Sequence, residues 1–225
     1  SAMSFTVGNT NISCNGGTDG TATINASGGV GGFTYLWNNG QTAATATGLS
    51  TGSHCVTATD GNNCTVNTCI QVDEPAVLEN MTFTSINASC FGTCDGQLTV
   101  SATGGTQPYN YLWTDGQTTV TATGLCAIGH AVTITDANGC LLLGNSSITE
   151  PTQLELSFLL DSVSCIGGND GGLTAVMSGG TSPYTYLWNA AANNQVTANA
   201  SGLIAGTYTV TATDGSISDS DDVIV

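Results

Sequence analysis

Apolar and polar residues alternate along short stretches of the chain. Ala22, Ile24 and Ala26 are separated by Thr and Asn, and the aromatic residues Phe33, Tyr35 and Trp37 recur at the same period of two. A period of two residues is typical of a strand with one buried face, whereas a helix would give a period of 3.6. The pattern therefore predicts an all-β protein with no helical stretch.

Three copies of one motif divide the chain. Cys14 recurs as Cys90 and Cys165, at spacings of 76 and 75 residues. Each copy continues with Asp-Gly, Gly-Gly, Tyr-Leu-Trp, Gly-Leu and Val-Thr-x-Thr-Asp, and the first two copies close on Glu-Pro. Such self-similarity indicates a repeat protein. We predict an expression remnant at 1–3, repeat 1 at 4–75, repeat 2 at 76–151 and repeat 3 at 152–225.

The length and punctuation of a copy favour one small domain each. Strands of five to eight residues are separated by Gly, Asn-Gly and Asp-Gly turns, which predicts three tandem small immunoglobulin-like β-sandwiches. A solenoid is disfavoured, because most solenoid repeats have 20 to 50 residues. Proline restricts the residue before it to extended conformations, so each Glu-Pro joint should be short and stiff. We expect a semi-rigid rod.

The order of these motifs resembles the SprB repeat of gliding-motility adhesins and other surface proteins of Bacteroidetes. The resemblance covers nearly the whole chain and implies a secreted or cell-surface location, export by the type IX secretion route, and a role as stalk units. Departures are the extra cysteines, the shortened third copy, and Gly31-Gly32 in place of Gln107-Pro108 and Ser182-Pro183. The middle copy carries the motif most completely, in Cys90, Asp95-Gly96, Gly104-Gly105, Pro108-Tyr109, Trp113, Gly124-Leu125, Asp136, Gly139-Cys140 and Glu150-Pro151.

Nine cysteines indicate an oxidising compartment and a disulfide-stapled fold. Cys14 and Cys64 occupy positions equivalent to Cys90 and Cys140, which predicts one disulfide within each of the first two repeats. Each of these bonds would close a loop of 50 residues and stabilise a domain with a small core.

The other cysteines are assigned by symmetry and elimination. Cys55 and Cys69 flank a predicted hairpin turn and should form a cross-strand disulfide, which leaves Cys94 and Cys126 to pair with each other. Cys165 has no partner in its copy, so it is either a free buried thiol or a link to another chain.

The net charge of the chain restricts the kinds of partner that it can bind. The chain has no Lys or Arg and sixteen Asp and Glu, which gives a formal net charge of −16. Binding to nucleic acid or to anionic lipid requires cationic side chains, so both are excluded for this segment. No apolar run approaches the roughly 18 residues of a membrane helix, so direct membrane insertion is not expected. The lack of Lys and Arg removes every trypsin-type cleavage site, which suits a protein exposed to hostile surroundings, and adaptation of the composition to high salt would explain the charge equally well.

Acidic side chains at the joints suggest a cation site. The Asp residues that precede Gly or open hairpin turns are structural by their context. Carboxylates at the joints could instead hold Ca²⁺ together with turn oxygens, although no EF-hand loop is present. The candidate ligands are Asp73, Glu74 and Glu79 at the first joint, and Glu150 and Glu155 at the second.

No residue pattern supports catalysis. His54 and His130 occupy a position where the third copy has Tyr208, and a metal ligand or general base would not be interchangeable with Tyr. No Ser-His-Asp arrangement is in register, so we expect that the segment is not an enzyme.

Three functions fit these observations. The first is a structural stalk or spacer in a secreted or cell-surface adhesin or filament, whose partners are neighbouring repeats of the same chain. The second is a multivalent glycan-binding module, which requires exposed rings at Trp37, Trp113 and Trp188, whereas core packing would bury them. The third is a self-associating extracellular fibre subunit, suggested by Cys165 and by sheet edges that lack Lys.

Overall fold

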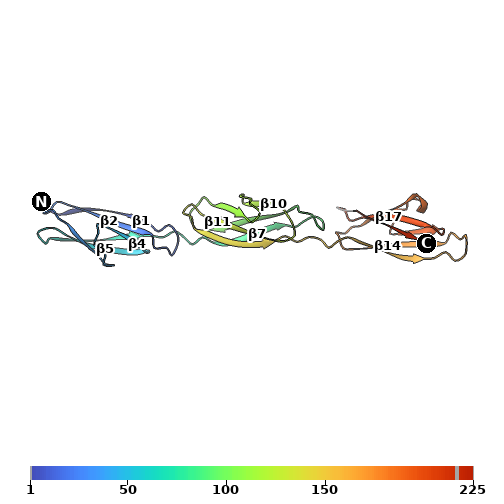
Figure 1. The fold of residues 1–225 in the computed structure, drawn as a ribbon, viewed down its shortest axis with the longest axis horizontal. Helices are drawn as coiled ribbons and strands as arrows, with labels where there is room; N and C mark the ends of the chain where they lie inside the picture. Colours follow the sequence, from blue (N-terminus) through green and yellow to red (C-terminus); the bar gives the residue numbers. More distant parts are fainter. Residues whose placement is uncertain (1, 216–217, 225) are drawn as a thin grey trace. The chain divides into compact units, whose positions relative to one another are not determined.

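Each repeat is built from two packed three-stranded sheets (Figure 1). The computed structural model describes residues 2–215 and the backbone of residues 218–224. Among these residues, no helix is long or apolar enough to cross a membrane. The first repeat contains β1 (Ser4–Thr10), β2 (Gly20–Ser27), β3 (Thr34–Trp37), β4 (Thr45–Leu49), β5 (Gly52–Thr59) and β6 (Thr65–Val72).

The other two repeats follow the same order of strands. The second contains β7 (Glu79–Ile86), β8 (Gly96–Thr103), β9 (Asn110–Trp113), β10 (Thr121–Leu125), β11 (Gly129–Thr135) and β12 (Leu141–Ser147). The third contains β13 (Glu155–Asp161), β14 (Gly171–Ser178), β15 (Thr185–Trp188), β16 (Asn199–Leu203), β17 (Thr207–Thr213) and β18 (Ser218–Ile224). The predicted boundaries after residues 75 and 151 fall between strands.

The topology is that of a small immunoglobulin-like sandwich. In the first repeat, one sheet has the order β1-β2-β4 and the other has the order β3-β5-β6. The second repeat has β10-β8-β7 and β12-β11-β9, and the third has β13-β14-β16 and β15-β17-β18. The chain therefore changes sheet after the second strand of each repeat, again after the third, and once more after the fourth. This confirms the predicted fold class.

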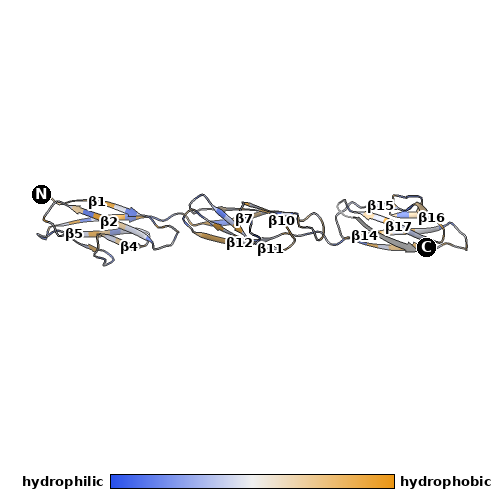
Figure 2. Cartoon of the chain, turned by 45° about the horizontal axis from the view of Figure 1, so that its top comes forward, coloured by the Kyte–Doolittle hydropathy of each residue, from blue (hydrophilic) through white to orange (hydrophobic). Residues whose placement is uncertain are grey.

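Alternating burial explains why these segments form strands. Along β2, Ala22 and Ile24 are buried, and the neighbouring Thr21 and Thr23 are half-buried. The strands β8 and β14 repeat this pattern, and Figure 2 shows the mixed hydropathy of single strands. In the first repeat the core combines both sheets, in Ala22, Ile24, Trp37, Ala46, Leu49, Val56, Ala58, Ile70 and Val72, with Ile12 beside them.

One short helical turn departs from the all-strand prediction. The third repeat has a 3₁₀ turn, η1 (Ala190–Ala192), in the segment that follows Trp188. The side chain of Asn189 accepts a hydrogen bond from the amide of Ala192, and Asn193 ends the turn in the left-handed conformation. This segment is three residues longer than its counterparts, since Gly202 follows Trp188 by 14 residues and Gly48 follows Trp37 by 11. The extra residues are accommodated as a turn of helix.

The linker that follows the first Glu-Pro lies against a double-glycine turn of the second repeat. The amide of Gly105 donates to the carbonyl of Ala76 at 2.9 Å. Gly105 has a φ of 56°, and a β-carbon there would meet the carboxylate of Asp136 at 2.8 Å and Leu78 at 3.2 Å. In the third repeat the amide of Gly180 likewise donates to Thr152. The double glycine is therefore required by both backbone conformation and space.

Replacing Gly105 by Ala should destabilise the second repeat more than the same change at Gly116. Both glycines have positive φ, but a β-carbon at Gly116 would meet nothing within 4 Å. We expect Gly116→Ala to cost about 1 kcal/mol from backbone strain and Gly105→Ala at least about 2 kcal/mol. Thermal unfolding followed by circular dichroism measures both. Equal losses would contradict the close packing of the linker on this turn.

Candidate functional site

A buried aspartate follows the fifth strand of each repeat, and in the first two repeats it organises the turn to the sixth strand. The carboxylate of Asp136 accepts hydrogen bonds from the amides of Thr106 at 2.8 Å, Asn138 at 2.9 Å and Cys140 at 2.9 Å. Asp60 accepts the equivalent three bonds from Val30, Asn62 and Cys64, and Asp214 accepts one from Thr181. The turn between β11 and β12 therefore holds Cys140 in a fixed position.

These amides also set the ionisation of the turn aspartates. Burial raises the pKa of Asp136, but the hydrogen bonds from Thr106, Cys140 and Asn138 outweigh it and hold the pKa below its ordinary value. For Asp60, the amides of Val30 and Cys64 lower the pKa in the same way. Each amide bond favours the charged carboxylate. With no Lys or Arg in the chain, main-chain dipoles replace the cationic partners that usually stabilise such groups.

A second aspartate shapes the loop before the second strand of each repeat. The carboxylate of Asp19 accepts hydrogen bonds from both the hydroxyl and the amide of Ser13, and these bonds lower its pKa. Asp95 and Asp170 are bonded to Ser89 and Ser164, with the same effect on the pKa of each. This loop carries the first cysteine of each repeat, so Cys14 is also held in place.

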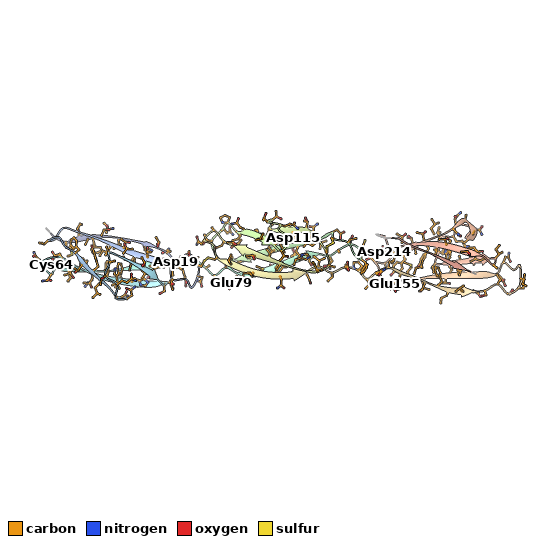
Figure 3. All side chains as sticks on the ribbon, in the orientation of Figure 1. Asp19, Cys64, Glu79, Asp115, Glu155 and Asp214 are labelled. Atoms are coloured by element: carbon orange, nitrogen blue, oxygen red, sulfur yellow. A yellow bond between two sulfur atoms is a disulfide. The ribbon has the colours of Figure 1, made fainter. Side chains whose placement is uncertain are left out.

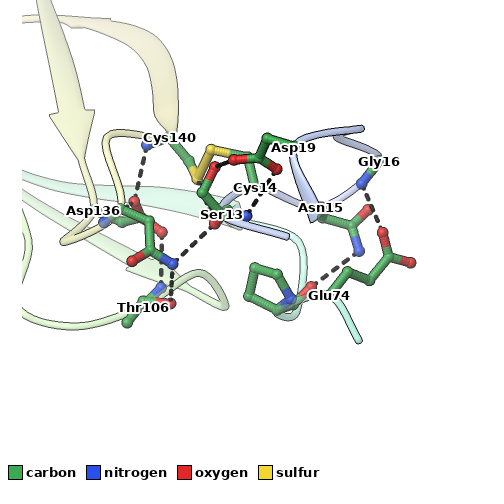
Figure 4. The surroundings of a disulfide bond; sticks show 11 residues. Ser13, Cys14, Asn15, Gly16, Asp19, Glu74, Thr106, Asp136 and Cys140 are labelled. Carbon is green, nitrogen blue, oxygen red and sulfur yellow. Dashed lines mark hydrogen bonds between the residues drawn. A yellow bond between two sulfur atoms is a disulfide. The ribbon is translucent and has the colours of Figure 1, made fainter. Parts of the chain in front are cut away.

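The two cysteine-bearing segments meet across the first joint. Cys14 of the first repeat and Cys140 of the second form a disulfide with a Cα–Cα distance of 5.6 Å, within the usual range (Figure 4). Beside it, the side-chain amide of Asn138 donates to the carbonyl of Ser13 at 2.9 Å and to the hydroxyl of Thr106 at 3.1 Å. The aspartate turn of one repeat is thus bonded covalently and by hydrogen bonds to the loop of the preceding one.

The Glu-Pro segment closes the other side of that loop. The amide of Gly16 donates to the carboxylate of Glu74 at 2.7 Å, and the side chain of Asn15 donates to the carbonyl of Pro75 at 3.0 Å (Figure 4). In the second repeat, Gly92 donates to Glu150 in the same way. The joint glutamates therefore fasten the cysteine loop to the end of its own repeat.

The predicted disulfides Cys14–Cys64 and Cys90–Cys140 are wrong. Cys14 pairs with Cys140 rather than with Cys64, and both Cys64 and Cys90 have free thiols. Cys64 precedes the eight-residue strand β6, whereas the Cys14 loop contacts Glu74 beyond its far end. A strand of this length spans about 26 Å, which no disulfide can bridge. Figure 3 shows Cys64 and Asp19 at opposite ends of the first repeat.

The remaining cysteines lie as follows. Cys55 and Cys69 form the expected cross-strand disulfide between β5 and β6, and Cys94 pairs with Cys126, as expected by elimination. Cys90 is buried. Cys165 is a free and exposed thiol, so the expectation that it would be buried is wrong.

The acidic residues proposed as calcium ligands are not gathered into one site. Besides Glu74 and Glu150, which bond glycine amides, Asp73 accepts from the side chain of Gln71 and Glu79 from that of Asn80. Glu155 is exposed at the start of β13. No group of three His, Cys, Asp or Glu residues suited to a metal ion occurs in the described part of the chain.

The histidines serve the same structural role as a tyrosine. The Nε2 atom of His54 lies 2.8 Å from the carbonyl of Ser50, and that of His130 lies 3.0 Å from the carbonyl of Cys126. Tyr208 in the third repeat donates its hydroxyl to the carbonyl of Ile204 at 2.9 Å. All three side chains bond the carbonyl four residues earlier, which explains why His and Tyr interchange here.

The proposed sugar-stacking platform is wrong, because the tryptophans are core residues. Trp37, Trp113 and Trp188 are at most 2% exposed. The indole N–H of each donates to a main-chain carbonyl, at Ala43, Thr119 and Thr197. The ring of Trp113 lies edge-on to Phe83 with centroids 6.3 Å apart. Leu36, Leu112 and Leu187 occupy the exposed face instead.

Asn138 is the functional residue that sequence reasoning missed. Its counterpart in the first repeat is Asn62, and both lie two residues after the turn aspartate and two before a cysteine. The shared pattern Asp-x-Asn-x-Cys was a signal of a common role, but its meaning depends on which loop faces the turn.

Comparisons with known proteins agree on the repeats. The model of the SprB repeat family matches residues 7–42, 82–118 and 160–193. The comparison with curated proteins gave no match.

Several solved structures match this chain at low sequence identity and low TM-score. Domains 1–5 of Sidekick-1, an immunoglobulin-domain chain, are 13% identical, with 100% of this chain and 58% of that one covered and a TM-score of 0.39. Domains 4–9 of the surface layer protein SbsC are 16% identical (100% and 47% covered, TM-score 0.29). Extracellular domains 3–5 of Drosophila OTK are 11% identical (92% and 91% covered, TM-score 0.30). This chain spans less than two thirds of the Sidekick-1 chain.

Acidification should destabilise the fold through the turn aspartates. The folded-state pKa of Asp136 lies below its ordinary value of 3.8, so its stabilisation is complete above about pH 4 and is lost as the pH falls through the folded pKa. We expect the urea midpoint to decrease between pH 6 and pH 2, and to decrease less in Asp136→Asn. An equally steep decrease in the variant would contradict this role of Asp136.

Loss of the disulfide across the joint should lower stability. Cys140→Ser opens a loop with a sequence separation of 126 residues, so we expect a loss of about 2 to 5 kcal/mol and a lower thermal midpoint. Cys64→Ser is the matched control, because Cys64 occupies the same turn position but is free and exposed. Its midpoint should stay unchanged. If Cys64→Ser were as damaging as Cys140→Ser, the pairing across the joint would be refuted.

Proposed function

Because the chain belongs to the SprB repeat family, we propose that it is a tension-bearing spacer in the repeat region of a cell-surface adhesin. Its work is mechanical: it separates a binding domain elsewhere in the protein from the cell and resists unfolding. The proposal includes an extracellular location and export by the type IX route, which the disulfides and the family support.

The observation that carries this proposal is the Cys14–Cys140 disulfide. When the two ends of the chain are pulled, force passes from Cys14 directly to Cys140 through the sulfur atoms. The residues between them carry no load and cannot be extended while the bond is intact. The other two disulfides lie within this shielded stretch. The bond therefore limits how far the first two repeats can lengthen, which suits a spacer under tension.

The side-chain chemistry supports a structural role and no catalytic one. Among the described residues, every buried side-chain nitrogen or oxygen has a hydrogen-bond partner. The buried aspartates, whose ionisation is perturbed, are saturated by main-chain amides rather than directed at a cavity. A catalytic carboxylate must instead reach a substrate. We infer that the segment has no enzymatic activity.

Single-molecule stretching of the whole chain tests the proposal. Full extension of 126 residues adds about 40 nm, so the reduced chain should extend about 40 nm farther than the oxidised chain before it becomes taut. Oxidised Cys14→Ser should gain only about two thirds of that length, because loops with separations of 14 and 32 residues remain closed.

The control for stretching is Cys64→Ser, whose oxidised extension should equal that of the unmodified chain. An oxidised chain that extends as far as the reduced one would show that the disulfide does not shield the repeats, and the tension-bearing role would be rejected.

A further inference from the structure

Two exposed free cysteines lie in segments that are equivalent to the two halves of the first joint, the Cys140 turn and the Cys14 loop. Cys64 lies in the aspartate turn of the first repeat, exposed at the end of the β5–β6 hairpin (Figure 3). Its amide donates to Asp60 at 2.9 Å, just as the amide of Cys140 donates to Asp136 at 2.9 Å. Cys64 is therefore presented in the same turn as the cysteine that bonds Cys14.

Cys165 lies in the loop that corresponds to the Cys14 loop. Its carbonyl accepts from the amide of Gly168 at 2.9 Å, and the carbonyl of Cys14 accepts from Gly17 at the same distance. Asp170 also accepts from the amide of Ser164 at 3.0 Å, as Asp19 does from Ser13. The third repeat thus offers the loop half of a joint with its thiol unpaired.

The hydrogen-bonding group that accompanies the disulfide is present as well. Asn62 occupies the position of Asn138, and the amides of both donate to the turn aspartate at 2.9 Å. The side chain of Asn138 bonds the carbonyl of Ser13, whose counterpart beside Cys165 is Ser164. Asn62 can therefore donate to the carbonyl of Ser164 when the two halves meet.

Apolar side chains are exposed on both halves. Ile166, next to Cys165, is 106% exposed, and Val30, whose amide bonds Asp60, is 49% exposed. In the joint between the first two repeats, the corresponding residues are Asn15 and Thr106, both polar. Burial of these apolar side chains against each other would favour contact between the two halves.

The third free cysteine, Cys90, does not compete for a disulfide with Cys64 or Cys165. Cys90 is buried, and the turn of the third repeat has Ser218 at the position of Cys140. In this sequence, Cys64 is thus the only unpaired cysteine in an Asp-x-Asn-x-Cys turn.

We propose that Cys165 of one copy of this chain forms a disulfide with Cys64 of a second copy, joining copies head to tail. Two thiols lose two protons and two electrons to form the bond. The electrons pass to a disulfide oxidant, either an exported thiol oxidoreductase or oxidised glutathione. The contact is heterologous, so one Cys64 and one Cys165 of each dimer remain unpaired and can form further bonds of the same kind.

Oxidation of the purified chain tests the proposal. In a glutathione redox buffer at high protein concentration, we expect a ladder of dimers, trimers and larger species on non-reducing gels, which collapses to monomer with reductant. Cys64→Ser and Cys165→Ser should each abolish species larger than a dimer. Cys90→Ser is the matched control and should keep the ladder, because its thiol is buried.

A mixing experiment separates this pairing from indiscriminate oxidation. When equal amounts of Cys64→Ser and a mass-tagged Cys165→Ser are oxidised together, mixed dimers should make up nearly all of the dimers, well above the half expected from random pairing. A statistical mixture or dimers made only of like copies would overturn the proposal, and so would a Cys64–Cys165 disulfide closed within one monomer of the unmodified chain. None of these results would bear on the Cys14–Cys140 bond or on the mechanical role.

A variant of Asn62 distinguishes docking of the two halves from the intrinsic reactivity of their thiols. Asn62→Ala should slow formation of the mixed dimer about 2- to 10-fold, the effect of one lost hydrogen bond. Its reaction with a small maleimide should be unchanged. Asn67→Ala, on the exposed side of β6, is the control and should leave both rates unaltered. An unchanged rate of dimer formation in Asn62→Ala would contradict docking in the geometry of the first joint.

Discussion

The carboxylate of Asp136, saturated by three main-chain amides, fixes the shape of the turn on which the joint depends. The same turn carries the side chain of Asn138 and the sulfur of Cys140 toward the preceding repeat. The chain has no cationic side chains, so main-chain amide dipoles stabilise its buried carboxylates. Only the folded backbone directs these amides at a carboxylate. The ionised turn and the folded sandwich therefore stabilise each other, and the disulfide follows from their geometry.

Small domains bury little apolar surface and often need covalent support. Here the disulfide at the joint does not link two parts of the same sandwich. It spans two repeats, while Cys55–Cys69 and Cys94–Cys126 each reinforce a single one. The two joints differ, because the third repeat has Ser218 where the second has Cys140. The first joint is thus closed by a disulfide, and no disulfide links the second and third repeats among the described residues.

Much of the fold could be predicted from the sequence, because the alternation around Ile24 and the recurrence of Trp37 report directly on burial. The structural role of the aspartate turns was also evident, since Asp before Gly or Asn is typical of turns. The pairing of Cys14 was not predictable in this way. Equivalence between copies shows that two cysteines share an environment, but it does not show whether the partner lies in the same copy or in the next. The length of β6 decides this, because it separates Cys14 from Cys64 by more than a disulfide can span.

Proteolysis at glutamate tests the central claim most directly, because all four glutamates lie in the two joints, at Glu74, Glu79, Glu150 and Glu155. The free thiols are first blocked in denaturant, and the chain is then cleaved without reductant and weighed by mass spectrometry. Because the Glu74-Pro75 and Glu150-Pro151 bonds resist cleavage, the chain is cut after Glu79 and Glu155, and the account predicts that fragments 1–79 and 80–155 remain linked through Cys14 and Cys140 and separate only on reduction. Two unlinked fragments, each with its disulfides closed internally, would contradict it.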